Sequence, residues 1–229
     1  MKPRAHQKTL KWDLFAEKWH LEVHHSERFL RGRSETISVV FRSGAASGVE
    51  LGCGSGFLTT ELSGCCNELI AIDSSFSMVA IARDELIRSG IDHVDLRVDD
   101  VTLLGTESFA SVDVVVASHL MGFLSGSERH RLSKNMLSWL RPGGCVVIAD
   151  QTSNRRRPRR RIRPPFLPIG RLSARRMVCL FEREGYWGAR VDWESDGAFV
   201  MSAFRPSSQG CEAIAGQEPA DCQQNQREN

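Results

Sequence analysis

The sequence lacks a hydrophobic run long enough to cross a membrane. Its 229 residues are 41% hydrophobic, which is ordinary for a globular domain. No apolar stretch approaches the roughly 18 residues that a membrane-spanning helix needs. The first residues are polar and basic, without the apolar core of a secretion signal. We therefore expect one globular domain in the cytoplasm, with no membrane partner.

Paired cysteines are also missing. The chain has seven cysteines and no Cys-x-x-Cys pair. This pattern argues against a disulfide framework and offers no metal-ligand spacing, so free thiols in a reducing compartment fit it best. His20 and His24 are four residues apart and could share a helix face. No third ligand is identifiable, so we expect no metal site.

Positive charge is concentrated in one segment. The formal net charge is +2, and residues 155–163 alone carry seven arginines. They lie in a loop, 151–172, that also has four prolines. Arginine binds carboxylates and phosphates bidentately, so the run fits an acidic acceptor or carrier, nucleic acid, or a solvated loop. Residues 206–229 are polar, and we expect a disordered tail there.

The most informative pattern is a glycine-rich turn at residues 49–56, which read Val-Glu-Leu-Gly-Cys-Gly-Ser-Gly. A short apolar run precedes the turn and a helical pattern follows at 57–62, so we expect strand, turn and helix. Gly52, Gly54 and Gly56 let the backbone turn sharply and approach a ligand. We interpret Cys53 as a small side chain in a tight loop rather than a nucleophile.

The charge before this turn indicates the kind of ligand. The carboxylate of Glu50 would repel a pyrophosphate and attract a ligand that carries an ammonium or a sulfonium. The dinucleotide-binding spacing G-x-G-x-x-G is also not met, because Phe57 stands where its last glycine would be. A second apolar run, 68–73, ends at Asp73, 23 residues after Glu50. An acid at that point is placed to accept hydrogen bonds from ribose hydroxyls.

These patterns together resemble the class I S-adenosylmethionine-dependent methyltransferases. Residues 49–56 match the family's motif E/D-x-G-x-G-x-G, and 140–144 match its L-x-P-G-G turn. The segment from Asp73 to Arg83 matches D-x-S-x-x-M-x-x-x-A-K/R at Ser75, Met78 and Ala82. The resemblance covers roughly 45–205 and implies S-adenosylmethionine as methyl donor, S-adenosylhomocysteine as product and a small-molecule acceptor.

The resemblance also implies the fold. We expect a Rossmann-like, doubly wound α/β sheet of seven mostly parallel strands that ends in an antiparallel hairpin. Strands are expected at 94–98, 112–117 and 145–150, helices at 128–140 and 173–184, and the hairpin at 186–193 and 198–204. We divide the chain into N-terminal cap helices (1–44), a core (45–205) and the tail (206–229).

The resemblance further implies which residues bind the cofactor. These are Trp19, Glu50, Gly52, Cys53, Gly54, Gly56, Asp73, Ser74, Met78, Asp99, Asp100, Val101 and Ser118. Met78 would pack against adenine, or serve as a plain core methionine. An acid after strand 94–98 would bind the adenine amino group, and counting favours Asp100 over Asp99. Each acid also suits a helix N-cap.

The acceptor is expected beside the end of strand 112–117. Ser118 and His119 follow that strand, and an imidazole can take a proton from a hydroxyl or an amine near neutral pH. His119 is our candidate base, and His20 is its main rival, with His24 and His25 behind it. Trp19 falls where the family often has a tyrosine near the cofactor, although its ring could also only pack the helix onto the core.

The sequence thus predicts methyl transfer to the oxygen or nitrogen of a small molecule. The arginine-heavy composition suggests a secondary metabolite, by association only. No Asn/Asp-Pro-Pro-Tyr/Phe motif follows strand 112–117, which argues against methylation of DNA adenine or protein glutamine. Two alternatives remain. An RNA methyltransferase could use the arginine run, although the rest of the chain is net acidic. A non-catalytic protein could keep the cofactor site.

Overall fold

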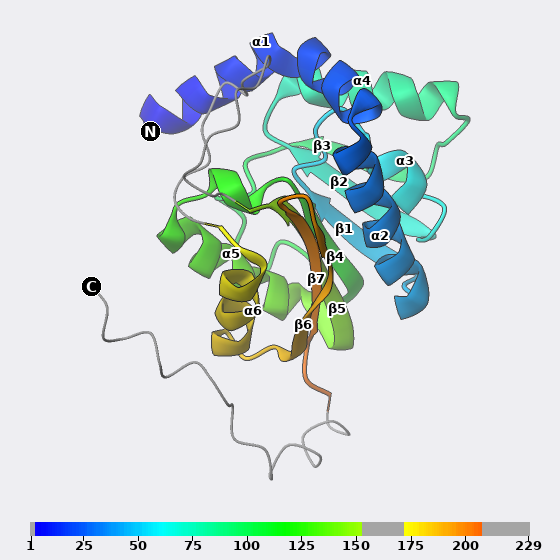
Figure 1. Ribbon diagram of the computed structural model, residues 1–229. Helices are drawn as coiled ribbons and strands as arrows, with labels where there is room; N and C mark the ends of the chain where they lie inside the picture. Colours follow the sequence, from blue (N-terminus) through cyan, green and yellow to red (C-terminus); the bar gives the residue numbers. More distant parts are fainter. Residues whose placement is uncertain (1–2, 153–171, 208–229) are drawn as a thin grey trace.

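The computed structural model describes residues 3–152 and 172–207, and the side chains from residue 9 onward within those ranges (Figure 1). The arginine run and nearly all of the polar tail therefore lie outside the described residues. The elements, in chain order, are α1 (Pro3–His25), α2 (Glu27–Ser43), β1 (Ser47–Leu51), α3 (Thr59–Leu62), β2 (Glu68–Asp73), α4 (Phe76–Arg88), β3 (Val94–Val98), β4 (Val112–Ser118), the 3₁₀ turn η1 (Met121–Phe123), α5 (Gly126–Trp139), β5 (Leu140–Gln151), α6 (Ala174–Arg183), β6 (Trp187–Ser195) and β7 (Ala198–Phe204).

The strands form the seven-stranded sheet that the sequence predicted. Their order is β3-β2-β1-β4-β5-β7-β6, and β1 pairs in parallel with both β2 and β4. Only β7 runs antiparallel to its neighbours, β5 and β6. The strand order reverses at β1 and β4, and the crevice beyond such a reversal is where open α/β sheets bind ligands.

Helices cover both faces of the sheet because side chains alternate along its buried strands. In β4, Val115 faces a cluster with α5 and α6, whereas Val114 and Val116 face a cluster with α2 and α3. Both sets are almost fully buried. A strand that is apolar on both faces needs this double cover, which explains the nearly continuous apolar run of β4.

The second N-terminal helix belongs to this core. Val39 and Val40 of α2 join the cluster that contains Val114 and Val147, and α2 packs on β5 and β7. Segment 1–44 was predicted to form cap helices, but only α1 lies over the carboxyl end of the sheet (Figure 1). No helix in the described part of the chain is both long and apolar enough to span a bilayer.

Several boundaries differ from the prediction for local reasons. The helix after Gly56 begins only at Thr59, because the glycine turn takes up the residues before it. The fifth helix begins at Gly126, since Ser125 caps it through a reciprocal capping box with Glu128. Strand β3 has the predicted bounds, and β4 extends one residue further, to Ser118.

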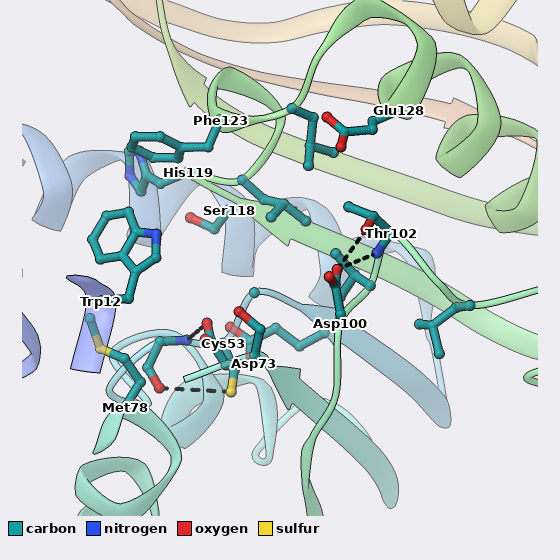
Figure 2. Close-up of a pocket in the computed structure, with 18 of the residues that line it drawn as sticks. Trp12, Cys53, Asp73, Met78, Asp100, Thr102, Ser118, His119, Phe123 and Glu128 are labelled. Carbon is teal, nitrogen blue, oxygen red and sulfur yellow. Dashed lines mark hydrogen bonds between the residues drawn. The ribbon is translucent and has the colours of Figure 1, made fainter. Parts of the chain in front are cut away.

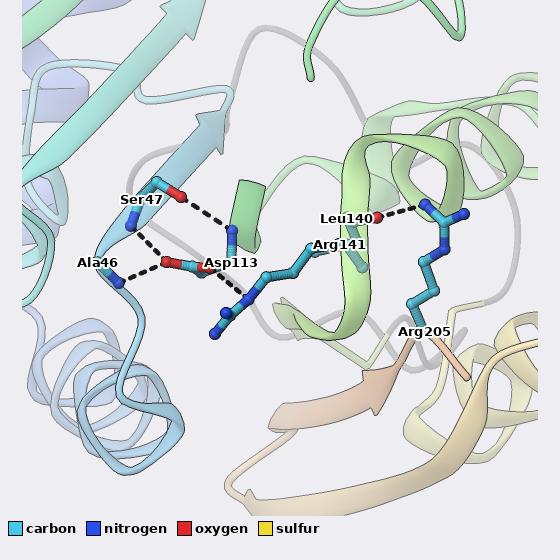
Figure 3. A network of polar contacts seen from close by, with 6 residues as sticks. All are labelled: Ala46, Ser47, Asp113, Leu140, Arg141 and Arg205. Carbon is cyan, nitrogen blue, oxygen red and sulfur yellow. Dashed lines mark hydrogen bonds and ion pairs between the residues drawn. The ribbon is translucent and has the colours of Figure 1, made fainter. Parts of the chain in front are cut away.

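Polar contacts fix the amino end of the sheet, opposite the crevice (Figure 3). One carboxylate oxygen of Asp113 accepts hydrogen bonds from the backbone N–H groups of Ala46 and Ser47, at 2.8 and 2.9 Å. Arg141 pairs with the other oxygen at 2.5 Å. These bonds hold the pKa of Asp113 below its ordinary value despite partial burial. They join the starts of β1 and β4 and leave the carboxyl ends free for a ligand.

Candidate functional site

A cavity of about 1300 Å³ lies at the carboxyl ends of β1, β2 and β4, beneath α1 (Figure 2). Most of the predicted site residues line it: Trp19, Glu50, Gly52, Cys53, Gly54, Asp73, Ser74, Met78, Asp100, Val101, Ser118 and His119. Three of the predicted residues, His20, Gly56 and Asp99, are absent from its lining. The sheet thus brings together residues from five separate segments of the chain.

The glycine turn has the backbone that its sequence predicted, but its glycines serve different purposes. Gly52, Gly54 and Gly56 all have positive φ, at 73°, 54° and 82°. A Cβ on Gly54 would point toward the Trp19 indole at 3.4 Å, on the cavity side. A Cβ on Gly56 would instead come within 3.0 Å of the backbone of Ala82. The expectation that Gly56 admits a ligand is therefore corrected, because this glycine lets α4 pack closely against the turn.

Asp73 ties the glycine turn to the start of α4. One of its carboxylate oxygens accepts a hydrogen bond from the N–H of Gly54 at 3.0 Å, and the other accepts from the N–H of Ser75 at 2.9 Å. Burial raises its pKa, and these two bonds oppose that effect. Each oxygen has two lone pairs, so the carboxylate can still accept a hydrogen bond from a ligand hydroxyl.

Glu50 is a buried carboxylate without a cationic partner among the described residues. Its side chain is 1% exposed, and Oε2 accepts a hydrogen bond from the Thr59 hydroxyl at 2.7 Å. Burial raises its pKa to about 7, and the negative charge of Asp73 adds to the effect. An ammonium or sulfonium in the cavity would supply the missing positive charge. The buried carboxylate of Glu50 therefore fits the positively charged part of the expected cofactor.

This pKa gives a testable pH dependence. A neutral Glu50 does not attract a cation, so binding of S-adenosylmethionine should strengthen as the pH rises through 7 and the carboxylate ionises. Relative to Glu50→Gln, we expect the wild-type affinity to increase by up to about tenfold from pH 6 to pH 8, as measured by titration calorimetry. The ligand's own ionisation is common to both proteins and cancels in this ratio. Parallel pH profiles for the two proteins would contradict the role of Glu50.

Burial also affects the reactivity of Cys53, the cysteine in the glycine turn. The Cys53 thiol is buried, and burial raises its pKa well above the ordinary value, with the charges of Asp73 and Glu50 adding to the rise. A thiol that stays protonated is a poor nucleophile. This agrees with the interpretation of Cys53 as a small residue in a tight loop.

The structure distinguishes the two neighbouring acids after β3. Asp100 lines the cavity together with Val101, whereas Asp99 is exposed and lies outside it. An oxygen of Asp100 accepts hydrogen bonds from the backbone N–H and the hydroxyl of Thr102, at 2.9 and 2.7 Å. Asp99 accepts a hydrogen bond from the N–H of Asp100. The preference for Asp100 therefore fits the geometry, and Asp99 supports the turn from outside.

His119 lies at the end of β4 among aromatic rings (Figure 2). Its ring centroid is 4.5 Å from that of Phe29 and 6.4 Å from that of Trp19, both edge to face. Its backbone has φ of 54°, and its N–H donates to Ala149 at 2.7 Å. Burial lowers the pKa of the imidazole to about 4. The ring is therefore neutral at pH 7 and can accept a hydrogen bond, but it is a weak base.

His20 does not line the cavity. Its Nε2 lies 3.4 Å from the carboxylate of Glu85 on α4, and its ring centroid is 4.5 Å from that of His24, with the two rings tilted at 57°. The two histidines share a helix face, as their spacing predicted, but that face points to α4. His20 is therefore corrected from a rival base to a contact between helices. His25 is exposed and bonds to the carbonyl of Leu21. In the described ranges no three His, Cys, Asp or Glu side chains group as metal ligands.

Two aromatic residues that line the cavity are not among the predicted site residues. Trp12 of α1 and Phe123 of η1 both line it, and their ring centroids are 5.2 Å apart. Trp12 also contacts Trp19 at 5.7 Å. A sequence signal did exist for Trp12, because it precedes Trp19 by seven residues and so shares its helix face. Phe123 follows a strand in an irregular segment, where no periodic pattern indicates the direction of a side chain.

Comparisons with known proteins find similarity to methyltransferases. Residues 49–144 match the family model described as a methyltransferase domain. A stretch of 139 residues is 30% identical to phosphoethanolamine N-methyltransferase 1 of Arabidopsis thaliana, covering 60% of this chain and 28% of that protein. A stretch of 117 residues is 28% identical to the ubiquinone biosynthesis O-methyltransferase of Xanthomonas axonopodis pv. citri (strain 306), covering 51% of this chain and 48% of that one. The chain thus spans less than half the length of these relatives.

Solved structures share the fold over most of the chain. The complex of DhpI with SAM and HEP superposes with a TM-score of 0.69 at 21% identity, covering 88% of this chain and 97% of that one. The N-methyltransferase NodS of Bradyrhizobium japonicum WM9, in complex with S-adenosyl-L-homocysteine, gives 0.60 at 16% identity, covering 84% of this chain and 98% of that one. At sequence identities this low, the similarity shows that the fold is shared and nothing more.

Proposed function

We propose that this chain, which carries a class I S-adenosylmethionine-dependent methyltransferase domain, transfers a methyl group to a hydroxyl or an amine of a small molecule. One observation carries the proposal: a single cavity joins a carboxylate-rich end, with Glu50, Asp73 and Asp100, to an aromatic end around His119. The first end matches the charges and hydroxyls of the cofactor. The second leaves room beside it for an acceptor.

The cofactor end is supported by what its groups can bind. Glu50 offers a buried negative charge to an ammonium or a sulfonium, and Asp73 offers free lone pairs to ribose hydroxyls. Met78, 2% exposed, and Val101, 7% exposed, offer apolar surfaces to a flat base, which Asp100 can bind at its edge. When bound, S-adenosylmethionine supplies a methyl group that its sulfonium has already activated.

The acceptor end indicates a molecule with an apolar or aromatic body. The acceptor end is lined by Trp12 and Trp19 of α1, by Phe123 of η1 and by His119. Among the described lining residues the only lysine or arginine is Arg131, which donates a hydrogen bond to the carbonyl of Thr102. Flat aromatic walls favour aromatic or apolar ligands. We therefore favour a secondary metabolite of this kind over a small phosphorylated amine.

The residues around the methyl group would act mainly by alignment. Displacement at an activated methyl requires the nucleophile to lie in line with the breaking bond, and water must be kept away. His119 is neutral at pH 7, so its free ring nitrogen can accept a hydrogen bond from the acceptor's O–H or N–H and orient a lone pair. With a pKa of about 4 it orients the nucleophile more effectively than it removes a proton.

The proposal is tested by measuring methyl transfer to a panel of acceptors. We would incubate the protein with radiolabelled S-adenosylmethionine and a catechol, an aromatic amine, phosphoethanolamine or RNA. We expect label in the catechol or the aromatic amine, at a rate at least about tenfold above that with phosphoethanolamine, because the described walls offer rings rather than free cations. Preferred labelling of RNA would support the alternative that uses the arginine run. Binding of the cofactor without transfer to any member would favour a non-catalytic role.

A further inference from the structure

Helix α1 is attached to the cofactor end of the site through one carboxylate. Oδ1 of Asp13 accepts a hydrogen bond from the Ser75 hydroxyl at 2.6 Å and another from the N–H of Ser77 at 3.1 Å. These partners lie 62 and 64 residues further along the chain, at the start of α4. Ser75 is fully buried, and its hydroxyl oxygen also accepts a bond from the N–H of Met78.

The same hydrogen bonds continue into the glycine turn. The N–H of Ser75 donates to one oxygen of Asp73, and the other oxygen accepts from the N–H of Gly54. One connected series of hydrogen bonds thus runs from α1 to the glycine turn, through Asp13, Ser75, Asp73 and Gly54. A shift of α1 at Asp13 moves Ser75, and Ser75 holds the carboxylate that is placed to meet the ribose.

Helix α1 is also a wall of the cavity, so its position affects both ends of the site. Trp12, next to Asp13 in the chain, lines the cavity and contacts Phe123 of η1. About two helical turns further along, Trp19 lies over Gly54. The helix has a second contact with α4, between His20 and Glu85 at 3.4 Å. Asp13 is the contact that fixes the end of α1 next to the cofactor residues.

We propose that Asp13 is a positioning residue for the cofactor, which couples the docking of α1 to the geometry of Asp73 and the glycine turn. The coupling is reciprocal, because a ligand that fixes Asp73 must stabilise α1 by the same factor by which α1 strengthens binding. The inference concerns the cofactor alone and does not depend on which acceptor is methylated.

The test compares two charge-removing variants on the same helix. Asp13→Ala removes the hydrogen-bond acceptor. Glu17→Gln removes a charge from an exposed position one helical turn away. By titration calorimetry with S-adenosylhomocysteine, we expect Asp13→Ala to raise the dissociation constant about tenfold and Glu17→Gln to leave it within about twofold of wild type. Asp13→Asn keeps an acceptor oxygen, so it should recover most of the lost affinity.

A second readout separates positioning from general support of the fold. Hydrogen exchange of α1 amides, measured with and without S-adenosylhomocysteine, should show ligand protection in wild type and Glu17→Gln and little in Asp13→Ala. If Asp13→Ala binds as tightly as wild type, or if α1 is protected equally in all three proteins, the proposal is overturned and the methyltransferase assignment stands. If wild type does not bind the ligand, both fail.

Discussion

Asp73→Ala is expected to raise the dissociation constant for S-adenosylhomocysteine at least about 100-fold. In the proposed function the Asp73 carboxylate accepts two hydrogen bonds from the ribose hydroxyls, and the variant removes both. It also leaves the N–H groups of Gly54 and Ser75 without their present acceptor. A hydrogen bond to a charged group contributes about 1.5–3 kcal/mol, so losing two such bonds accounts for at least a 100-fold effect. The turn would also lose its connection to the start of α4.

The control for this prediction is Asp84→Ala, an exposed acid on α4. It removes the same charge from the helix that follows Asp73, and we expect its affinity to match wild type in titration calorimetry. Thermal unfolding without ligand would show how much of the Asp73→Ala effect comes from the fold. A binding constant within about threefold of wild type for Asp73→Ala would rule out this carboxylate as the ribose acceptor.

His119→Ala should lower kcat about 100-fold while leaving the dissociation constant for S-adenosylhomocysteine within about twofold of wild type. Positioned acid–base groups contribute about 100- to 10,000-fold. We expect the lower limit here, because an imidazole with a pKa of about 4 is a weak base and acts mainly by orientation. Single-turnover kinetics with the best acceptor would isolate the step that His119 affects. His25→Ala is the matched control, since His25 is exposed on α1.

The pH profile distinguishes this histidine from one with an ordinary pKa. Because the folded pKa is depressed, the imidazole stays in its active, neutral form as the pH falls through 6.5 and is protonated only near 4. The His119 contribution, measured as the ratio of wild-type to His119→Ala kcat, should therefore stay constant from pH 8 to about pH 5. A ratio that falls with a midpoint near 6.5 would indicate a solvated base. A large loss of cofactor affinity in His119→Ala would assign the residue to the cofactor site.

The sequence predicted the order of strands and helices because each element carries its own local signal. The apolar run that ends at Asp73, the acid–glycine turn after Val49 and the Pro-Gly-Gly turn at 142–144 can each be identified within a few residues. Parallel strands bring their carboxyl ends together, so the chain positions of Glu50 and Asp73 were enough to predict that they lie close together, and the family resemblance added Asp100. Residues that are far apart in the sequence thus lie close together, because their strands end at the same edge of the sheet.

The direction of a side chain on α1 could not be predicted in the same way. His20 and Trp19 are adjacent in the chain, yet one faces α4 and the other faces the glycine turn. Which face of an amphipathic helix meets which neighbour depends on how the helix docks, and no local pattern encodes that. For the same reason Gly56 was interpreted by its motif, although its lack of a side chain matters for the backbone of Ala82.

The edge-to-face contact between Trp12 and Phe123 has a consequence for the timing of turnover. The rings come from α1 and η1, two separate walls of the cavity, and their centroids are 5.2 Å apart. In the proposed function the acceptor binds beside these rings, so we expect a bulky product to leave only after the two walls separate, and the spent cofactor to exchange after that opening. We therefore expect an initial burst of methylated product, followed by a slower steady rate that is governed by departure rather than by transfer.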